Sequence, residues 1–293
     1  MSIMRTRSAG LVFVLFATLL WSSVGLLVRM AALDSWSIVL WRSLFTALAL
    51  GPFWLIASRN RAESIRATFS KAGLLTVGLA IAGNVSYIGA LQLTSVATVM
   101  TIYAALPFVT AAMGLVVLRE PLSRRFGAAA ALATTGIVIT AGAAISATDI
   151  AGIAVSFFMT ASWAGLLVQA KKHPTLDLTL LSLVSAAGAA LIALPLAPIG
   201  LPSRDSLLIC ALLGVLTSGL ANVLTLMGGR SLRSGETGLL MLLDVVLSPL
   251  WVWLAFDEQA GGSALLGGAL VVAAVAAYLI ADVPRRTARC PAA

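Results

Sequence analysis

The chain has 293 residues, of which 60% are hydrophobic and only 10% are charged, and its mean hydropathy is +1.04. This composition leaves no stretch polar enough for a soluble domain, so the soluble classes of protein are excluded. A formal net charge of +8 would suit a nucleic-acid partner, but the basic residues are divided among short loops beside apolar runs, which indicates membrane topology instead.

The basic residues also predict the orientation of the chain. Sixteen of the 19 Lys and Arg residues lie on alternate connections or at the termini, and the exceptions are Arg29, Arg42 and Arg204. Because loop Lys and Arg resist translocation, we predict that this side is cytoplasmic, with both termini inside, in the inner (cytoplasmic) membrane of the cell. Arg5 and Arg7 precede an apolar run, as in a signal peptide, but no cleavage site follows, so we expect a retained first span.

Ten apolar segments are long enough to cross a bilayer, whose core of about 30 Å needs roughly 20 helical residues. Their hydrophobicity is continuous rather than alternating, which favours helices over a closed barrel. The first five predicted spans are Gly10 to Ala31, Trp36 to Ala57, Ala72 to Leu93, Ser95 to Leu118 and Arg125 to Ile145. The second five are Asp149 to Ala170, Leu178 to Pro198, Ser206 to Gly228, Ser234 to Ala255 and Ser263 to Asp282. We therefore predict an all-α polytopic membrane protein with ten transmembrane helices.

The two halves of the chain repeat one another. The stretch from Asn84 to Glu120 aligns without a gap on the stretch from Asn222 to Glu258, at an offset of 138 residues. This predicts two five-helix repeats, at residues 1–145 and 146–293. Five is an odd number, so the second repeat would be inverted in the membrane, as in many secondary transporters that bind substrate between their halves.

Four segments resemble a known family. They are Leu20 to Gly25 (LWSSVG), Trp41 to Ser43 (WRS), Ala90 to Glu120, and Leu239 to Glu258 (LLMLLDVVLSPLWVWLAFDE). The chain resembles the EamA-type transporters of the drug/metabolite transporter superfamily, and within it the bacterial exporters of amino acids, including aromatic ones. The resemblance implies the ten-helix drug/metabolite transporter fold. The chain departs from the family at Asp244 and Val245, where many relatives carry Glu-Pro.

Seven residues are candidates for substrate binding. A rise of about 1.5 Å per residue places Trp21, Asn84, Tyr103 and Asp244 near the middle of the bilayer, with Trp163 and Asn222 somewhat displaced. Tyr87 shares a helix face with Asn84, three residues away, and Thr225 stands in the same relation to Asn222. These aromatic and amide groups could contact a substrate, or they could pack and hydrogen-bond helices to one another.

Asp244 is the carboxylate placed deepest in a predicted span. Intramembrane acids are usually functional, so we expect Asp244 to contact a substrate ammonium or to carry a coupling proton; a structural salt bridge or hydrogen bond is the alternative. We expect Arg42, near the outer end of its span, to anchor the helix by extending to water.

Two prolines and several tryptophans suggest further roles. Pro107 and Pro249 each remove a backbone hydrogen bond beside a candidate polar residue, so they are hinge candidates, or they merely bend helices for packing.

Tryptophans near span ends are expected in the headgroup belt: Trp36, Trp41, Trp54, Trp251 and Trp253. Gly and Ala crowd spans 5 and 10, which indicates close packing or a dimer face.

The leading hypothesis is a secondary exporter of small amphipathic metabolites, most of all amino acids with aromatic or hydrophobic side chains, working by alternating access. Export of cationic drugs or quaternary amines is the alternative, because aromatic rings with Asp244 suit a cation. A membrane scaffold without transport is the second alternative. The chain lacks enzyme motifs, metal clusters and a nucleotide-binding loop, so we predict no catalysis, no cofactor and a gradient as the energy source. Its partners would be a small-molecule substrate and the lipid bilayer; proton coupling and a homodimer are compatible with the sequence, although a monomer suffices.

Overall fold

The computed structural model describes residues 6–58, 60–93, 99, 102–103, 105–121, 123–141, 150–256 and 262–282, and all that follows refers to these. Their regular structure is helical throughout, with no strand. This is the expected outcome for continuous apolar runs, because a helix satisfies its backbone polar groups within the segment. The all-α expectation is therefore confirmed for the described chain.

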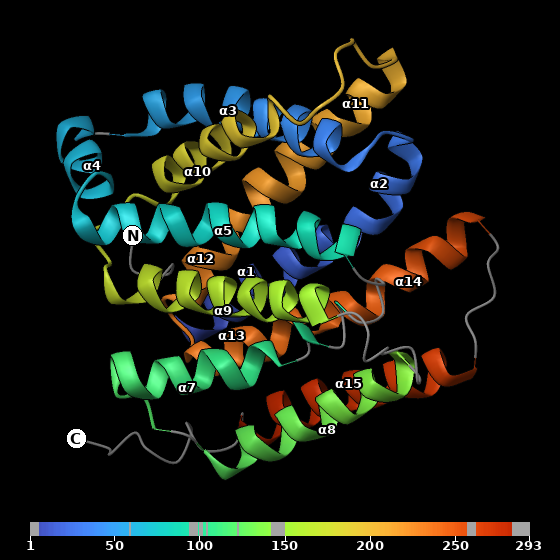
Figure 1. Cartoon of the computed structure of the whole chain (residues 1–293). Coiled ribbons are helices and arrows are strands. Elements are labelled where there is room, and N and C mark those ends of the chain that lie inside the picture. The colour runs from blue at the N-terminus through green and yellow to red at the C-terminus, as the bar shows by residue number, and fades with distance from the viewer. Residues whose placement is uncertain are drawn as a thin grey trace.

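The helices follow one another in two sets (Figure 1). In the first half they are α1 (Arg7–Ser22), α2 (Val24–Ala31), α3 (Ser35–Ala57), α4 (Arg61–Thr68), α5 (Lys71–Leu93), α7 (Leu106–Leu118) and α8 (Arg124–Ala141). In the second half they are α9 (Ile150–Lys172), α10 (Leu178–Ala193), α11 (Arg204–Leu212), the π-helix η2 (Leu213–Ala221), α12 (Asn222–Gly229), α13 (Ser234–Met241), α14 (Leu243–Phe256) and α15 (Gly262–Asp282).

Some segments predicted as single helices are broken. The first span divides at Ser23, where the hydroxyls of Ser22 and Ser23 donate to the carbonyl oxygens of Leu19 and Leu20, at 2.7 and 2.6 Å. Serine hydroxyls that bond back to the preceding turn compete with the helical hydrogen bonds and bend the helix. The connection between the second and third spans, predicted to be a loop, contains the short helix α4.

The fourth and ninth spans break at corresponding places. The N–H of Ala105 donates to the Ile102 carbonyl at 3.0 Å just before α7, and the N–H of Leu242 donates to the Leu239 carbonyl at 3.2 Å just before α14. These tight three-residue turns interrupt each helix. The offset of 138 residues aligns Ala105 with Leu243, so the breaks of the two halves lie one residue apart in the repeat alignment.

Neither break has a helix-interior proline at its centre, and the hinge role of Pro107 and Pro249 stays a prediction. Pro107 lies in the first turn of α7, where a proline removes no helical hydrogen bond. Pro249 lies within α14, which continues through it, while the break comes earlier, at Leu242. The side chain of Pro249 is outside the described residues.

The packing of the helices is symmetric between the halves. Helices α3 and α10, α7 and α13, and α8 and α15 contact one another, and each pair joins the same predicted span of the two repeats (Figure 1). Other contacts also occur in matching pairs. Helix α5 packs on α9, and the helices of the corresponding spans in the other repeat, α12 and α1, pack on each other. The contact between α8 and α15 supports the packing interpretation of their small residues.

Four helical segments are long and apolar enough to cross a membrane alone: Arg7–Val28, Ser35–Ala57, Ile150–Lys172 and Arg204–Gly229. The pair formed by α4 and α5, bent by 69°, would make a fifth. Shorter apolar helices include α7 and α10, and α10 ends at Ala193, earlier than the predicted seventh span. The count of ten spans therefore stays a prediction.

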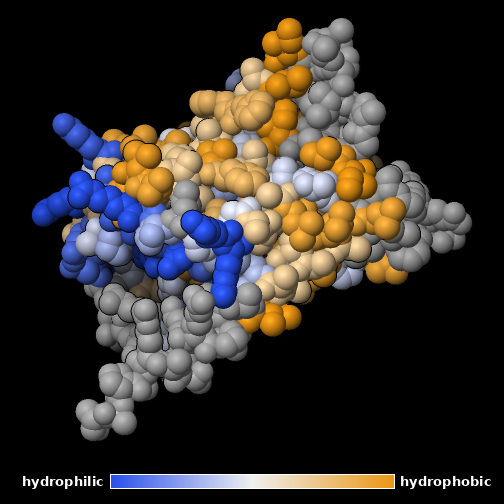
Figure 2. All heavy atoms as spheres, turned by 90° about the horizontal axis from the view of Figure 1, so that it is seen from below, coloured by the Kyte–Doolittle hydropathy of each residue, from blue (hydrophilic) through white to orange (hydrophobic). Residues whose placement is uncertain are grey.

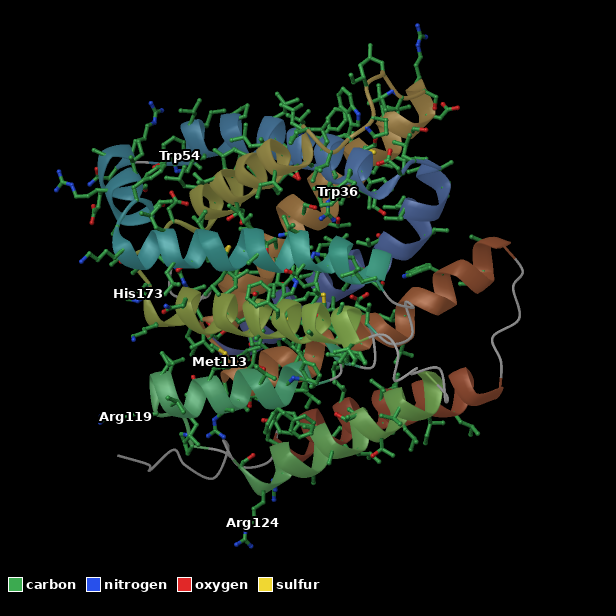
Figure 3. The ribbon with its side chains drawn as sticks, viewed as in Figure 1. Trp36, Trp54, Met113, Arg119, Arg124 and His173 are labelled. Atoms are coloured by element: carbon green, nitrogen blue, oxygen red, sulfur yellow. The ribbon has the colours of Figure 1, made fainter. Side chains whose placement is uncertain are left out.

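Polar and apolar surfaces are separated along the helices. On the face shown in Figure 2, hydrophilic side chains gather at one end and hydrophobic ones cover most of the remaining described surface. Figure 3 shows Arg119 and His173 at one end of the bundle, with Trp36 toward the other. We call the end that carries Arg7, Lys171 and Arg230 the basic end.

Close contact between α1 and α12 at the basic end depends on glycine. A Cβ added to Gly228 would lie 2.7 Å from the carbonyl oxygen of Gly10, which is backbone and cannot turn aside. We expect Gly228→Ala to destabilise the fold by about 1–3 kcal/mol, the usual cost of overpacking. Thermal unfolding in detergent would measure it. Gly78→Ala is the matched control, because nothing lies within 4 Å of its added Cβ, and an equal loss of stability in both variants would refute this account of Gly228.

Candidate functional site

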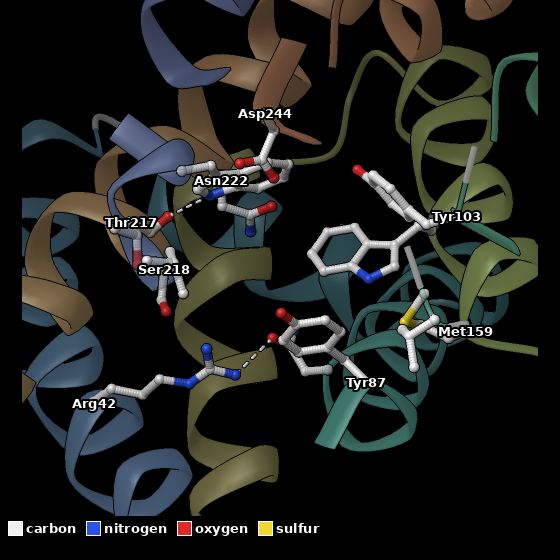
Figure 4. A pocket seen from close by; sticks show the side chains of 13 residues that line it. Arg42, Tyr87, Tyr103, Met159, Thr217, Ser218, Asn222 and Asp244 are labelled. Atoms are coloured by element: carbon white, nitrogen blue, oxygen red, sulfur yellow. Dashed lines mark hydrogen bonds between the residues drawn. The ribbon is translucent and has the colours of Figure 1, made fainter. Parts of the chain in front are cut away.

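A cavity of about 130 Å³ lies between the two halves of the chain (Figure 4). It is lined by Trp21, Val24, Arg42, Asn84, Tyr87, Val99, Tyr103, Met159, Trp163, Thr217, Ser218, Asn222 and Asp244. All seven residues predicted to bind substrate are among them. The sequence therefore predicted which side chains meet, although whether they bind a substrate stays a prediction. Of the hinge candidates, Pro107 does not line this cavity, and the side chain of Pro249 lies outside the described residues.

Aromatic rings form one part of the cavity wall. The rings of Trp21 and Trp163 meet edge to face, with centroids 5.4 Å apart at an interplanar angle of 70°. The indole N–H of Trp21 donates to the carbonyl oxygen of Thr217 at 2.8 Å, which fixes the ring against η2. Gly83 stands behind Trp163, because a Cβ added there would lie 3.2 Å from the indole nitrogen. The two rings thus present fixed apolar faces, as aromatic pairs of this geometry do.

The π-helix η2 was not predicted from the sequence. Its wide turn ends where the N–H of Asn222 bonds the carbonyl of Gly219, and the carbonyl of Thr217 accepts the Trp21 indole instead. Gly214 lets η2 approach α3 closely, since an added Cβ would clash with the backbone of Arg42. Single π-helical turns are frequent at functional sites, and this one brings Thr217 and Ser218 to the cavity.

Two asparagines bridge helices at the cavity wall. The Asn84 carbonyl Oδ1 accepts from Arg42 Nη2 at 3.2 Å, while its Nδ2 donates to the Ala80 carbonyl at 2.9 Å. In the other half, Asn222 Nδ2 donates to the hydroxyl of Ser182 at 3.0 Å. Helix bridging and cavity lining are therefore combined in both residues. Thr225 is buried and is not part of the cavity lining.

The cavity holds one acidic and one basic side chain of the described residues. Asp244 lies in the first turn of α14, immediately after the break at Leu242, where the positive end of the helix dipole favours an anion. Its carboxylate makes no hydrogen bond or ion pair with any described residue, so the structural salt bridge considered for it is absent there. Arg42 lies at a different end of the cavity (Figure 4).

Arg42 and Trp54 are placed differently from their predicted positions. Arg42 does not extend to water: only 8% of the residue is exposed, and its guanidinium faces the cavity. Trp54 is also 8% exposed, and its N–H donates to Asp177 Oδ2 at 2.8 Å rather than to a headgroup. The N–H of Trp251 donates to Ser22 Oγ at 2.7 Å. The side chain of Trp253 is outside the described residues.

A charged network lies at the basic end. Glu236, near the start of α13, accepts from Arg7 Nη2 at 3.3 Å, from the Tyr278 hydroxyl at 2.6 Å and from the Arg233 N–H at 3.1 Å. Glu236 is 5% exposed, and its hydrogen bonds connect α13 to α1 and α15. We call this cluster the Glu236 network. Four apolar side chains of α12 and α13 are also almost fully buried: Leu226, Leu239, Leu240 and Met241.

A second ion pair joins the ends of α7 and α9. Glu120 pairs with the Lys171 ammonium, and its other oxygen accepts from the Ser234 N–H at 2.9 Å. Burial by itself would raise the pKa of Glu120, but these two donors outweigh it and hold the pKa below its ordinary value. The pair therefore stabilises the closed basic end at neutral pH, and this stabilisation is lost as the pH falls through the lowered pKa.

The comparisons agree with a transporter architecture. The EamA-like transporter family model matches the chain twice, at residues 8–142 and 146–280. The chain is also similar to a solved structure described as "Crystal structure of protein", with a TM-score of 0.81 and 19% identity over 97% of this chain and 100% of that one. That likeness shows the fold alone. No curated protein matches the chain. Because the family model covers most of the sequence in two copies, the chain belongs to the EamA-like transporter family, whose members are multi-pass membrane transporters of small solutes rather than enzymes.

Proposed function

We propose that this protein is a secondary exporter of small amphipathic metabolites, in the first place amino acids with aromatic or hydrophobic side chains. The observation that carries the proposal is a cavity lined from both halves by aromatic rings, amides and two opposite charges. Binding pockets combine an apolar wall with a few placed polar groups in this manner. The aromatic part would hold the side chain of the substrate, and Asp244 would hold its ammonium or carry a coupling proton.

The proposed mechanism is alternating access between two inverted five-helix repeats, residues 1–145 and 146–293. The helix contacts support this, because contacts made by spans of one repeat recur between the corresponding spans of the other repeat. The corresponding breaks before α7 and α14 give each repeat a place to bend beside the cavity.

The basic end is proposed to face the cytoplasm, in the inner membrane, because loop Lys and Arg resist translocation. The Glu236 network and the buried leucines then separate the cavity from the cytoplasm. In this state a substrate would reach the cavity from the outer side. Export requires the basic end to open, which makes it the inner gate of the cycle.

Export of cationic drugs is the second candidate. Asp244 pairs with no described residue and lies in a cavity lined by Trp21, Trp163 and Tyr103. It is therefore suited to a quaternary or protonated amine through charge attraction and cation–π contact. The two candidate functions differ in the recognition of a carboxylate. An amino acid exporter would bind the carboxylate of its solute, whereas a cation exporter would not need one.

Counterflow in proteoliposomes tests the function. Purified protein would be reconstituted in vesicles loaded with unlabelled phenylalanine, and uptake of radiolabelled phenylalanine would be followed. We expect transient accumulation well above that of protein-free vesicles, inhibited by other hydrophobic amino acids. If amino acids move no faster than in empty vesicles and a labelled organic cation accumulates, the cationic-drug proposal replaces this one. If neither moves, the transport proposal is refuted for both classes of solute.

A further inference from the structure

Arg42 has fewer partners than a buried guanidinium requires. One hydrogen bond, from Nη2 to Asn84 Oδ1 at 3.2 Å, joins it to a neutral acceptor. Its Nε is buried and has no hydrogen-bond partner, and no carboxylate in the described part of the chain forms an ion pair with it. A charge removed from water is normally paired or fully hydrogen-bonded. The cavity therefore contains a guanidinium that forms no direct ion pair with any described residue.

The surrounding backbone holds Arg42 toward the cavity. The Thr46 hydroxyl lies 2.8 Å from the carbonyl oxygens of both Arg42 and Gly214, which ties α3 to η2 at this level. The close approach of Gly214 leaves no room for even a Cβ there. With the backbone fixed in this way, the guanidinium extends into the cavity toward Tyr87 (Figure 4).

The second half of the chain shows that helix bridging does not need an arginine. Asn222 corresponds to Asn84 in the repeat, and its partner Ser182 stands on α10, the counterpart of α3. A neutral hydroxyl makes that bridge. The positive charge of Arg42 is thus an addition in one half only, and it lies on the cavity side.

We propose that Arg42 is the carboxylate-binding residue of the cavity and that Asn84 is its positioning residue. A guanidinium offers planar pairs of N–H groups that match the two oxygens of a carboxylate. The guanidinium of Arg42 faces the cavity. Asn84 is itself fixed by Ala80 and holds the fork in place. This inference rests on the proposed transport function and narrows it, because substrates that carry a carboxylate are preferred over amines of the same shape.

Matched pairs of solutes test the inference directly. Phenylalanine and phenethylamine differ by one carboxylate, as do leucine and isoamylamine, and their Kd values would be measured on the purified full-length protein by quenching of tryptophan fluorescence. We expect the wild type to bind each amino acid at least about tenfold more tightly than its amine, and Arg42→Gln to reduce that ratio to about one. Charge-assisted hydrogen bonds have this magnitude.

Further variants keep the test valid if Arg42→Gln fails to fold. Arg42→Lys keeps the charge without the fork and should give an intermediate ratio, and Asn84→Ala should also lower the ratio. Arg204→Gln, an exposed arginine at the start of α11, is the control and should leave every ratio unchanged. A wild type that binds amines as tightly as amino acids overturns the inference but not transport. Failure to bind any of the four solutes counts against both the inference and the proposed substrate class.

Discussion

Asp244→Asn is expected to raise the Kd for substrates that carry an ammonium group by about 10- to 100-fold, with the fold intact. The substitution keeps the shape of the side chain and removes the acidic group of the cavity. A hydrogen bond to a charged group contributes about 1.5–3 kcal/mol, and each 1.4 kcal/mol is a factor of ten. Because no described residue depends on this carboxylate for a hydrogen bond or ion pair, the loss should appear in binding rather than in stability.

Binding, thermal unfolding and flux at several pH values would be measured together. Asp205→Asn is the matched control, since Asp205 is an exposed carboxylate in the first turn of α11. If Asp244 carries a coupling proton, the pH dependence of wild-type flux should disappear in Asp244→Asn. Unchanged affinity together with an unchanged pH profile would remove Asp244 from the mechanism.

Glu236→Ala is expected to open the basic end. The substitution takes away the acceptor shared by Arg7, Tyr278 and the Arg233 N–H, in a place that is almost completely buried. Removing one partner of a buried charged pair costs about 3–5 kcal/mol. When that loss falls on the closed state alone, the closed-to-open ratio changes by at least about 100-fold.

A cysteine at Ser218 would report the opening, with Cys210 and Cys290 replaced by alanine. Its reaction with a membrane-impermeant thiol reagent applied from the basic side should speed up by about 10- to 100-fold in Glu236→Ala. Glu63→Ala is the control, because Glu63 is exposed on α4. Equal reactivity with and without Glu236, in a correctly folded protein, would show that the network does not act as the inner gate.

Seven of the 13 residues that line the cavity were predicted from the sequence. Asn84 and Tyr87 share a helix face by their spacing, and the repeat adds Asn222 in the other half. Depth in a span is nearly a property of sequence, because a helix advances about 1.5 Å per residue. The all-helical class follows equally directly from hydropathy and from the need to satisfy backbone groups in lipid.

What escaped prediction depends on contacts between distant segments. The position of Arg42 near the end of α3 suggested access to water, but the packing of η2 through Gly214 encloses it. Helix bends were expected at prolines inside helices, whereas one break lies at Ser22 and Ser23, one at Ala105 just ahead of Pro107, and one at Leu242. The π-helix likewise has no local signature beyond its glycines.

Whether substrate binds between the two halves is best tested by a structure determined with a transported amino acid bound. We expect ligand density in the cavity between the halves, with the carboxylate at Arg42 and the side chain against Trp21 and Trp163. Density for the only bound substrate outside this cavity, or a substrate held by one half of the chain alone, would contradict it.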